Sequence, residues 1–300
     1  MTRIMVVGEG MLELSGDESG WQLGYGGDTL NTAIHLARFG HEVAFATALG
    51  AEPFSDELRQ RWRDEGLDIS LVLADPNRLP GLYAIRTDAD GERSFTYWRG
   101  ESAARQMFVL PDSQRLSDAA DRADLLLFSL ISLAILPAPS REMLFDLCRR
   151  TRARGGRIAF DGNYRPRLWR DTAEAIEVRD AAIALCDVGL PTLEDELALS
   201  GQSTATEVAA HWQVLGAKET IVKLGAEGCL VGDRIVAPAA RLSPVDTSGA
   251  GDAFNAGYLH ARIGGAVPLD AARCGHALAG WTLMRRGAVP ASDASAPYRR

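Results

Sequence analysis

Residues 246–262 read DTSGAGDAFNAGYLHAR and predict a glycine-rich turn that leads directly into a helix. Gly249 and Gly251 allow a tight backbone whose amides point inward. The apolar residues that follow recur at the spacing of one helix face (Phe254, Tyr258, Ala261). The free N–H groups and the positive dipole end of such a helix favour an anion. Asp252 is therefore placed as a carboxylate base beside an anion-binding turn, with an ordinary capping residue as the alternative.

This stretch resembles the second signature of the ribokinase/PfkB family of sugar kinases, D-T-x-G-A-G-D followed by a helix of small residues. Every fixed position is present. The resemblance implies that Asp252 removes the proton of the acceptor hydroxyl. It also implies that Gly249, Ala250 and Gly251 hold the charge that develops on the transferred phosphoryl group. Phosphoryl transfer depends mainly on alignment and charge stabilisation, which a carboxylate and a ring of amides can supply.

Length and composition favour a globular protein without a membrane segment. Three hundred residues, 46% of them hydrophobic, fit one large α/β domain or two smaller ones. No apolar run approaches the roughly 20 residues of a membrane helix, and the N-terminus lacks a signal-peptide pattern, so a cytoplasmic protein is expected. The net charge of −8 indicates no binding to nucleic acid or anionic membranes. No metal-ligand spacing occurs among the histidines and cysteines, which predicts buried, reduced thiols and no structural zinc (Cys148, Cys186, Cys229, Cys274).

Strand and helix patterns alternate along most of the chain. They predict an α/β fold with a mostly parallel central sheet flanked by helices on both faces. Strands are predicted at 4–7, 43–49, 69–73, 125–130, 157–160, 188–191, 219–224 and 229–231, and helices at 28–39, 57–66, 140–152, 172–185, after 251 and at 269–284. A dinucleotide-binding fingerprint after the first strand is disfavoured, because Glu13 stands where the third glycine is required.

Two segments interrupt this alternation and predict a small β-sheet lid, at about 10–26 and 80–99. The first carries short strands with alternating polarity, and the second reads as a hairpin of 82–87 and 93–98 around a turn at 88–91. No internal repeat or linker is present, so the lid is interpreted as an insertion. The family resemblance implies a single ribokinase-like kinase domain over residues 1–300.

The phosphate donor needs a site other than a P-loop, because no G-x-x-x-x-G-K-[ST] motif occurs. A K-x-G-x-x-G turn at 223–228 offers amides for phosphates; an ordinary hairpin turn is the alternative. Its place before the Asp252 motif matches the nucleotide loop of the family. The resemblance therefore implies that ATP is bound by Lys223, Gly225, Ala226 and Gly228, together with Gly249 and Gly251.

Family members usually carry an N-x-x-E motif that organises Mg²⁺ and phosphate, and this chain has TLEDE at 192–196 instead. Glu194 and Asp195 could hold a hydrated Mg²⁺ through water, which is the usual mode for that ion. The alternative is a helix start that is rich in acidic residues.

Arginine placement indicates an acidic acceptor. Tyr97 and Arg99 are two residues apart on a predicted strand and so share one face. Arg165 follows a predicted strand end, where open α/β sheets place ligands. Two guanidiniums directed at one pocket favour a carboxylate over a neutral sugar. The alternatives are a solvated strand face for Arg99 and packing within the lid for Tyr83 and Tyr97.

Almost the whole chain also resembles one branch of the family, the 2-keto-3-deoxygluconate kinases. The matching stretches are GGDTLNTA at 26–33, RLPGLYAIRTDADGER at 78–93, YWRGESAA at 97–104 and FDGNYRPRLW at 160–169. The resemblance implies that the sugar acid is contacted by Gly27, Tyr83, Tyr97, Arg99 and Arg165. It implies that Asn163, Arg165 and the 225–228 turn face the nucleotide.

The Gly-Gly pair at 26–27 has a physical role of its own. It lets the backbone approach a ligand closely, and Asp28 and Asn31 can bond hydroxyl groups there. The alternative for these residues is an N-cap for the following helix.

The predicted function is ATP- and Mg²⁺-dependent phosphorylation of the terminal hydroxyl of 2-keto-3-deoxygluconate. The alternatives are a kinase for a neutral sugar or nucleoside and a catalytically silent sugar-acid sensor, which the intact Asp252 signature disfavours. Related kinases suggest a homo-oligomer formed through the outer face of the lid. The sequence does not separate the gluco from the galacto epimer.

Overall fold

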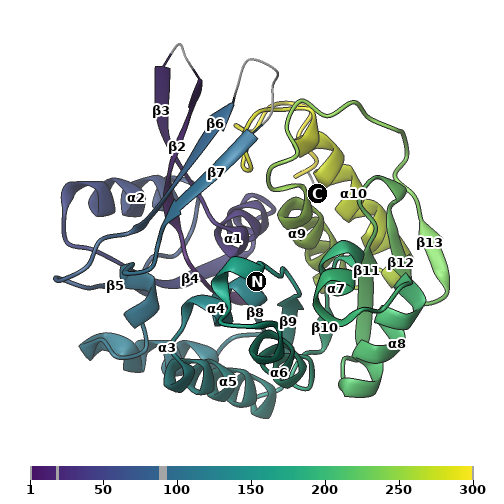
Figure 1. Ribbon diagram of the computed structural model, residues 1–300, viewed down its shortest axis with the longest axis horizontal. Helices are drawn as coiled ribbons and strands as arrows, with labels where there is room; N and C mark the ends of the chain where they lie inside the picture. Colours follow the sequence, from purple (N-terminus) through teal and green to yellow (C-terminus); the bar gives the residue numbers. More distant parts are fainter. Residues whose placement is uncertain (1, 18–19, 88–92, 299–300) are drawn as a thin grey trace.

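The computed structural model describes residues 2–17, 20–87 and 93–298, and a nine-stranded sheet runs through its centre (Figure 1). The strand order is β13-β12-β11-β10-β9-β8-β1-β4-β5. Neighbours from β5 to β11 pair parallel, whereas β12 and β13 are added antiparallel at the edge. The strands are β1 (Arg3–Val7), β4 (Glu42–Leu49), β5 (Val72–Ala74), β8 (Leu125–Ser129), β9 (Arg157–Asp161), β10 (Val188–Gly189), β11 (Glu219–Lys223), β12 (Cys229–Val231) and β13 (Arg234–Val236).

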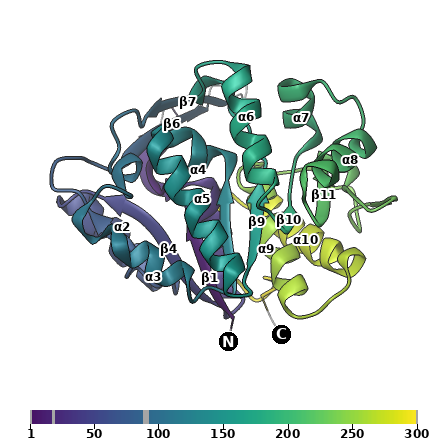
Figure 2. The ribbon, with the colours of Figure 1, turned by 90° about the horizontal axis from the view of Figure 1, so that it is seen from below.

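Helices cover both faces of this sheet (Figure 2). One face packs against α1 (Asp28–Arg38), α2 (Pro53–Asp64), α9 (Ala250–Ile263) and α10 (Pro268–Leu283). The other packs against α3 (Gln114–Ala120), α4 (Leu130–Ile135), α5 (Ala138–Ala153), α6 (Thr172–Ile183), α7 (Leu193–Ser200) and α8 (Ala205–Leu215). Short 3₁₀ turns lie at Ala103–Gln106, Pro111–Ser113, Pro166–Leu168 and Gly225–Glu227. Within the described ranges no helix is long and apolar enough to cross a membrane.

A separate four-stranded sheet stands beside the central one (Figure 1). Its strands, in the order β3-β2-β6-β7, are β2 (Met11–Asp17), β3 (Gly20–Gly26), β6 (Gly81–Thr87) and β7 (Arg93–Trp98). Because β2 begins four residues after β1 ends, this small sheet is rooted at the carboxyl end of the central strands. Its strands fall in the two segments predicted for the lid, and the predicted turn at 88–91 lies outside the described residues.

The predicted α/β fold with a mostly parallel sheet is confirmed, and the differences have local causes. The apolar run after position 125 was expected to stay extended through residue 130, but it turns into α4. Ser129 ends the strand because its hydroxyl accepts the Ser132 amide and its own amide donates to the Ser132 hydroxyl, both at 3.1 Å, forming a capping box. Helices α3, α7 and α8 and strand β13 were not predicted. Cys274 is exposed, so the expectation of four buried thiols is wrong there.

A buried ion pair joins the predicted helix α6 to α7, which the sequence did not predict. Arg179 on α6 donates to Glu196 on α7 at 2.7 Å and to Ser200 at 2.8 Å, and neither charged side chain reaches solvent. The same guanidinium pairs with Asp180 and lies 3.3 Å from the His211 ring nitrogen on α8. Removing one member of such a pair leaves an uncompensated buried charge.

We expect Arg179→Met to lower the free energy of unfolding by about 3–5 kcal/mol in urea titrations, because Glu196 then lacks its cation. The double variant Arg179→Met/Glu196→Gln should recover most of that loss, since both charges are gone. Equal unfolding midpoints for the single variant and the parent chain would contradict this account.

Candidate active site

The carboxyl ends of the parallel strands bring charged side chains to one edge of the central sheet. Glu9 follows β1, while Asp161 and Lys223 are the last residues of β9 and β11. Helix α9, which carries Asp252 in its first turn, packs against α1 at the same edge. Open α/β sheets place their ligands at this edge. The strand order therefore assembles the predicted motifs although they lie far apart in the sequence.

The turn before α9 leaves backbone amides free at the helix start. Gly249 has a φ of 69°, and a Cβ on it would lie 2.6 Å from the Ala288 carbonyl oxygen, so glycine is required there. The first bond of the helix runs from the Ala253 amide to the Gly249 carbonyl at 2.8 Å. The preceding amides, including those of Ala250 and Gly251, therefore have no intrahelical acceptor. This arrangement fits the predicted anion-binding turn.

Asp252 is buried and does not cap its own helix. Its carboxylate accepts from the Asn31 side chain of α1 at 2.8 Å, and its backbone carbonyl accepts from the Thr32 hydroxyl at 3.2 Å. Burial raises the pKa of Asp252 to about 8, helped by the negative charge of Asp28. The ionised, base-competent form thus grows as the pH rises toward 8.

Asp28, whose charge acts on Asp252, is in direct contact with Asn163. The Asn163 amide donates to the Asp28 carboxylate at 3.2 Å, which joins the loop after β9 to the start of α1. Burial is the main cause that raises the pKa of Asp28. The N-cap of α1 is Gly27, with a φ of 154°, so Asp28 is not the capping residue. A Cβ on Gly27 would overlap the Glu9 carbonyl oxygen, so this glycine is already required by packing inside the protein.

The Lys223 side chain contacts the end of β9 and helix α9. Its ammonium donates to Asp161 at 2.8 Å and to Asn255 at 3.2 Å. The 225–228 turn connects β11 to β12 as a hairpin, with the Leu224 amide bonded to the Gly228 carbonyl at 2.8 Å. The backbone thus adopts the hairpin that the sequence left as the alternative.

Residues of the small sheet reach the same edge. The Arg99 guanidinium, 9% exposed, is paired with Glu9 through Nε at 2.7 Å and through Nη2. The interpretation of Arg99 as a solvated strand face is therefore wrong. Tyr83 is buried, donates to Glu13, and stacks on Tyr97 with ring centroids 5.8 Å apart. Burial and the Glu13 charge raise the pKa of Tyr83 well above its usual range.

Arg165 pairs with an acidic residue of its own. Its side chain is 51% exposed, donates to the Tyr164 carbonyl at 2.7 Å and lies 3.4 Å from Asp195. Burial raises the pKa of Asp195 to about 6. Arg99 and Arg165 thus contact different carboxylates, and the structure shows no direct contact that brings the two guanidiniums together.

The acidic segment at 192–196 forms the first turn of α7. Glu194 is exposed, Asp195 is partly buried, and Glu196 is held by Arg179 in the interior. Among the described residues no group of three or more His, Cys, Asp or Glu side chains is placed to hold a metal ion. Oxygen ligands from one or two carboxylates are nevertheless what a hydrated Mg²⁺ on a nucleotide needs. Glu194 and Asp195 fit that limited requirement.

Four polar residues at this edge were not predicted as site residues: Glu9, Glu13, Asp161 and Asn255. The sequence holds a signal for two of the four. Asp161 directly follows the predicted strand at 157–160, and Asn255 lies three positions after Asp252, on the same face of the helix. The pairing of Glu9 and Glu13 with the small sheet depends on tertiary contacts.

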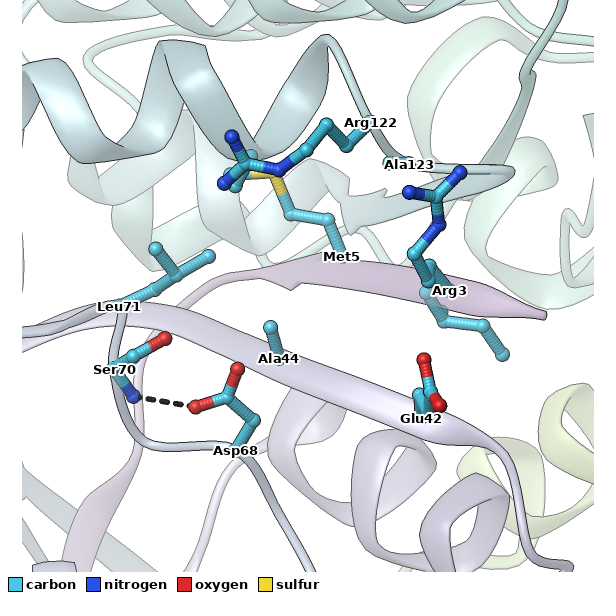
Figure 3. Close-up of a pocket in the computed structure, with 11 residues that line it drawn as sticks. Arg3, Met5, Glu42, Ala44, Asp68, Ser70, Leu71, Arg122 and Ala123 are labelled. Carbon is cyan, nitrogen blue, oxygen red and sulfur yellow. Dashed lines mark hydrogen bonds between the residues drawn. The ribbon is translucent and has the colours of Figure 1, made fainter. Parts of the chain in front are cut away.

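A cavity of about 190 Å³ opens at the other end of the central sheet (Figure 3). It lies beside the amino ends of β1 and β4, with Arg3 and Arg122 on one side and Glu42 and Asp68 on the other. No residue of the Asp252 site lines it. We therefore place the candidate active site at the carboxyl edge, on the basis of the side-chain contacts there.

Comparison with known proteins identifies the family of this chain. The model of the pfkB family carbohydrate kinases matches residues 1–294. The 2-dehydro-3-deoxygluconokinase of Escherichia coli (strain K12) is 43% identical over 298 residues, which cover 96% of each chain.

The crystal structure of 2-dehydro-3-deoxygluconokinase from Thermotoga maritima matches with a TM-score of 0.85 at 21% identity, over 96% of this chain and 95% of that one. Fructokinase from Vibrio cholerae O395, solved with fructose, ADP and a calcium ion, matches with a TM-score of 0.81 at 27% identity, over 96% and 95%. The chain therefore belongs to the pfkB family of carbohydrate kinases and has its ribokinase-like α/β fold.

Proposed function

We propose that this kinase transfers the γ-phosphoryl group of ATP to the terminal hydroxyl of 2-keto-3-deoxygluconate, also called 2-dehydro-3-deoxygluconate. The observation that carries the proposal is the buried Asp252 carboxylate next to the free amides at the start of α9. The 43% identity to the Escherichia coli 2-dehydro-3-deoxygluconokinase supports this choice of acceptor.

Asp252 acts as the base in the proposed reaction. The proton of the acceptor hydroxyl passes to its carboxylate, and the alcohol oxygen bonds to the γ-phosphorus. The bond from that phosphorus to the β–γ bridging oxygen breaks, and its electron pair leaves with ADP. The amides of Gly249, Ala250 and Gly251 stabilise the charge on the transferred group.

The acceptor lies between α1 and the small sheet in this proposal. Asp28 and Asn31 bond its hydroxyls, and the Gly27 backbone, Tyr83 and Tyr97 border it. Arg99 and Arg165 recognise its carboxylate, because a guanidinium has five donors and the Glu9 pair uses only some of those on Arg99.

The nucleotide lies over the ends of β9 and β11. We propose that Asn163, Arg165 and the turn residues Gly225, Ala226 and Gly228 border it, with Gly249 and Gly251 at its phosphates. Mg²⁺ would be held through water by Glu194 and Asp195 and would neutralise phosphate charge when bound.

The small sheet is proposed to act as a lid that excludes water from the transfer. Its Trp98 ring is exposed on the strand face opposite to Tyr97 and is suited to pairing with a second copy of the chain. We propose a cytoplasmic location, where ATP is available and the free thiols stay reduced.

A kinase for a neutral sugar is the second candidate, and one observation favours it. Glu9 already balances the charge of Arg99, so the pocket between α1 and the small sheet holds no unpaired buried cation from that residue. Substrate comparison between sugar acids and neutral sugars separates the two functions.

We expect Asp252→Asn to lower kcat roughly 10²- to 10⁴-fold with little change in affinity, because the variant keeps the side-chain volume but accepts no proton. A coupled ADP-release assay gives kcat, and calorimetry gives sugar-acid binding. A variant that keeps most of its kcat would show that Asp252 is not the base.

The same residue makes stability depend on pH. The pKa of Asp252 is about 8 in the folded chain, whereas the ordinary value of 3.8 applies in the unfolded chain. Between these values the unfolded chain binds fewer protons, so stability falls as pH rises. Asp252→Asn removes this pH-dependent loss of stability, because the amide does not ionise. We expect the variant to equal the parent near pH 4 and to exceed it at pH 8, on the order of a few kcal/mol, in urea unfolding. Exposed Asp56→Asn is the control, and parallel curves for all three chains would refute the expectation.

Acceptor charge can be tested at Arg99. We expect Arg99→Ala to raise KM for 2-keto-3-deoxygluconate roughly 10- to 100-fold while KM for fructose stays within threefold, because only the acid loses a charged hydrogen bond. The same change in a Glu9→Gln background removes the unpaired carboxylate, and Arg86→Ala serves as an exposed control on the small sheet. Equal losses for both sugars would favour the neutral-sugar kinase.

A further inference from the structure

Lys223 forms a closed polar network with two partners from other elements. Its side chain is about 10% exposed, and its ammonium donates to Asp161 Oδ1 at 2.8 Å and Asn255 Oδ1 at 3.2 Å. Asn255 Nδ2 in turn donates to Asp161 Oδ2 at 3.0 Å. The network thus joins the end of β9, the end of β11 and the second turn of α9.

This network lies directly behind the anion-binding turn. A Cβ built on Gly251 would be 3.9 Å from the Lys223 nitrogen, and Asn255 follows Asp252 by three residues on the same helix. A buried ion pair adds little to stability compared with apolar packing. Its position beside the reacting groups therefore favours a role in the reaction.

Three charged groups and one phenol face Asp252, and they come from four elements. Asp28 on α1 and Asp161 on β9 raise the pKa of Asp252, and Lys223 on β11 lowers it. Tyr83 on β6 faces the same carboxylate, and Asn31 donates to it as a neutral group. Lys223 is therefore the cation that offsets the crowding of carboxylates around the base.

We propose that Lys223 is a positioning residue for phosphoryl transfer, and not a ligand of the nucleotide. Through Asp161 and Asn255 it fixes the start of α9 against the ends of β9 and β11. Its charge favours the ionised form of Asp252. This inference rests on the proposed function, in which Asp252 is the base.

The test compares the pH dependence of kcat/KM for the sugar acid at saturating ATP in three variants. We expect Lys223→Met to shift the acidic limb of this pH profile up by roughly one pH unit, because Asp252 loses a neighbouring cation. Asp161→Asn should shift the limb down by a similar amount, because Asp252 loses a neighbouring anion. The double variant should return the limb near its parent position while kcat stays reduced. KM for ATP should remain within about threefold throughout, and Lys223→Arg should keep the parent limb.

Opposite shifts in the two single variants are what a purely structural role would not produce. If the acidic limb stays at its parent position in both single variants, the inference is overturned. It is also overturned if Lys223→Met raises KM for ATP more than tenfold and leaves the acidic limb unchanged. If Lys223→Met does not fold, the Asp161→Asn shift decides alone. Failure of the proposed function is distinguishable, because Asp252→Asn would then remain active.

Discussion

The crowding of carboxylates at one end of a parallel sheet is the constraint on which this site depends. Asp28, Asp161 and Asp252 come from three elements that the strand order brings together, and the first two raise the pKa of the buried Asp252. Like charges in such a place disfavour ionisation. Asn31 and Lys223 provide the compensating donor and cation, so the geometry of the site and its electrostatics have the same origin.

The crowding of carboxylates raises the pKa of Asp252, which suits the proposed base but lowers the stability of the fold. A carboxylate with a pKa near 8 takes up a proton more readily than one at its usual value. The same shift means that the folded chain resists ionisation which the unfolded chain accepts freely. Stability is therefore given up at the residue that the proposed chemistry uses, as expected where strained or unfavourable electrostatics are retained for activity.

The sequence predicted most of the elements and the motif, but not the contacts across the fold. Helix α9 and Asp252 followed from DTSGAGD, because glycines and a helical repeat are local signals. The partner of Asp252, Asn31, lies 221 positions away, and the partner of Arg99, Glu9, lies 90 away. Such pairings depend on strand order. The break between β8 and α4 was missed for a different reason, because a serine capping box is weaker in sequence than the apolar run that contains it.

The pairing of Arg99 with Glu9 changes how acid recognition has to be understood. A lone buried guanidinium would attract any anion, including the phosphates of ATP, for which we propose a place over the neighbouring strand ends. Glu9 pairs with Nε and Nη2 of Arg99 and balances its charge. A ligand therefore gains binding energy from Arg99 only by accepting from the N–H groups that Glu9 does not use. One oxygen of Glu9 is buried without a hydrogen-bond partner, so the pair is not fully satisfied on its own. Selectivity for a sugar acid then depends on the direction of the remaining donors more than on net charge.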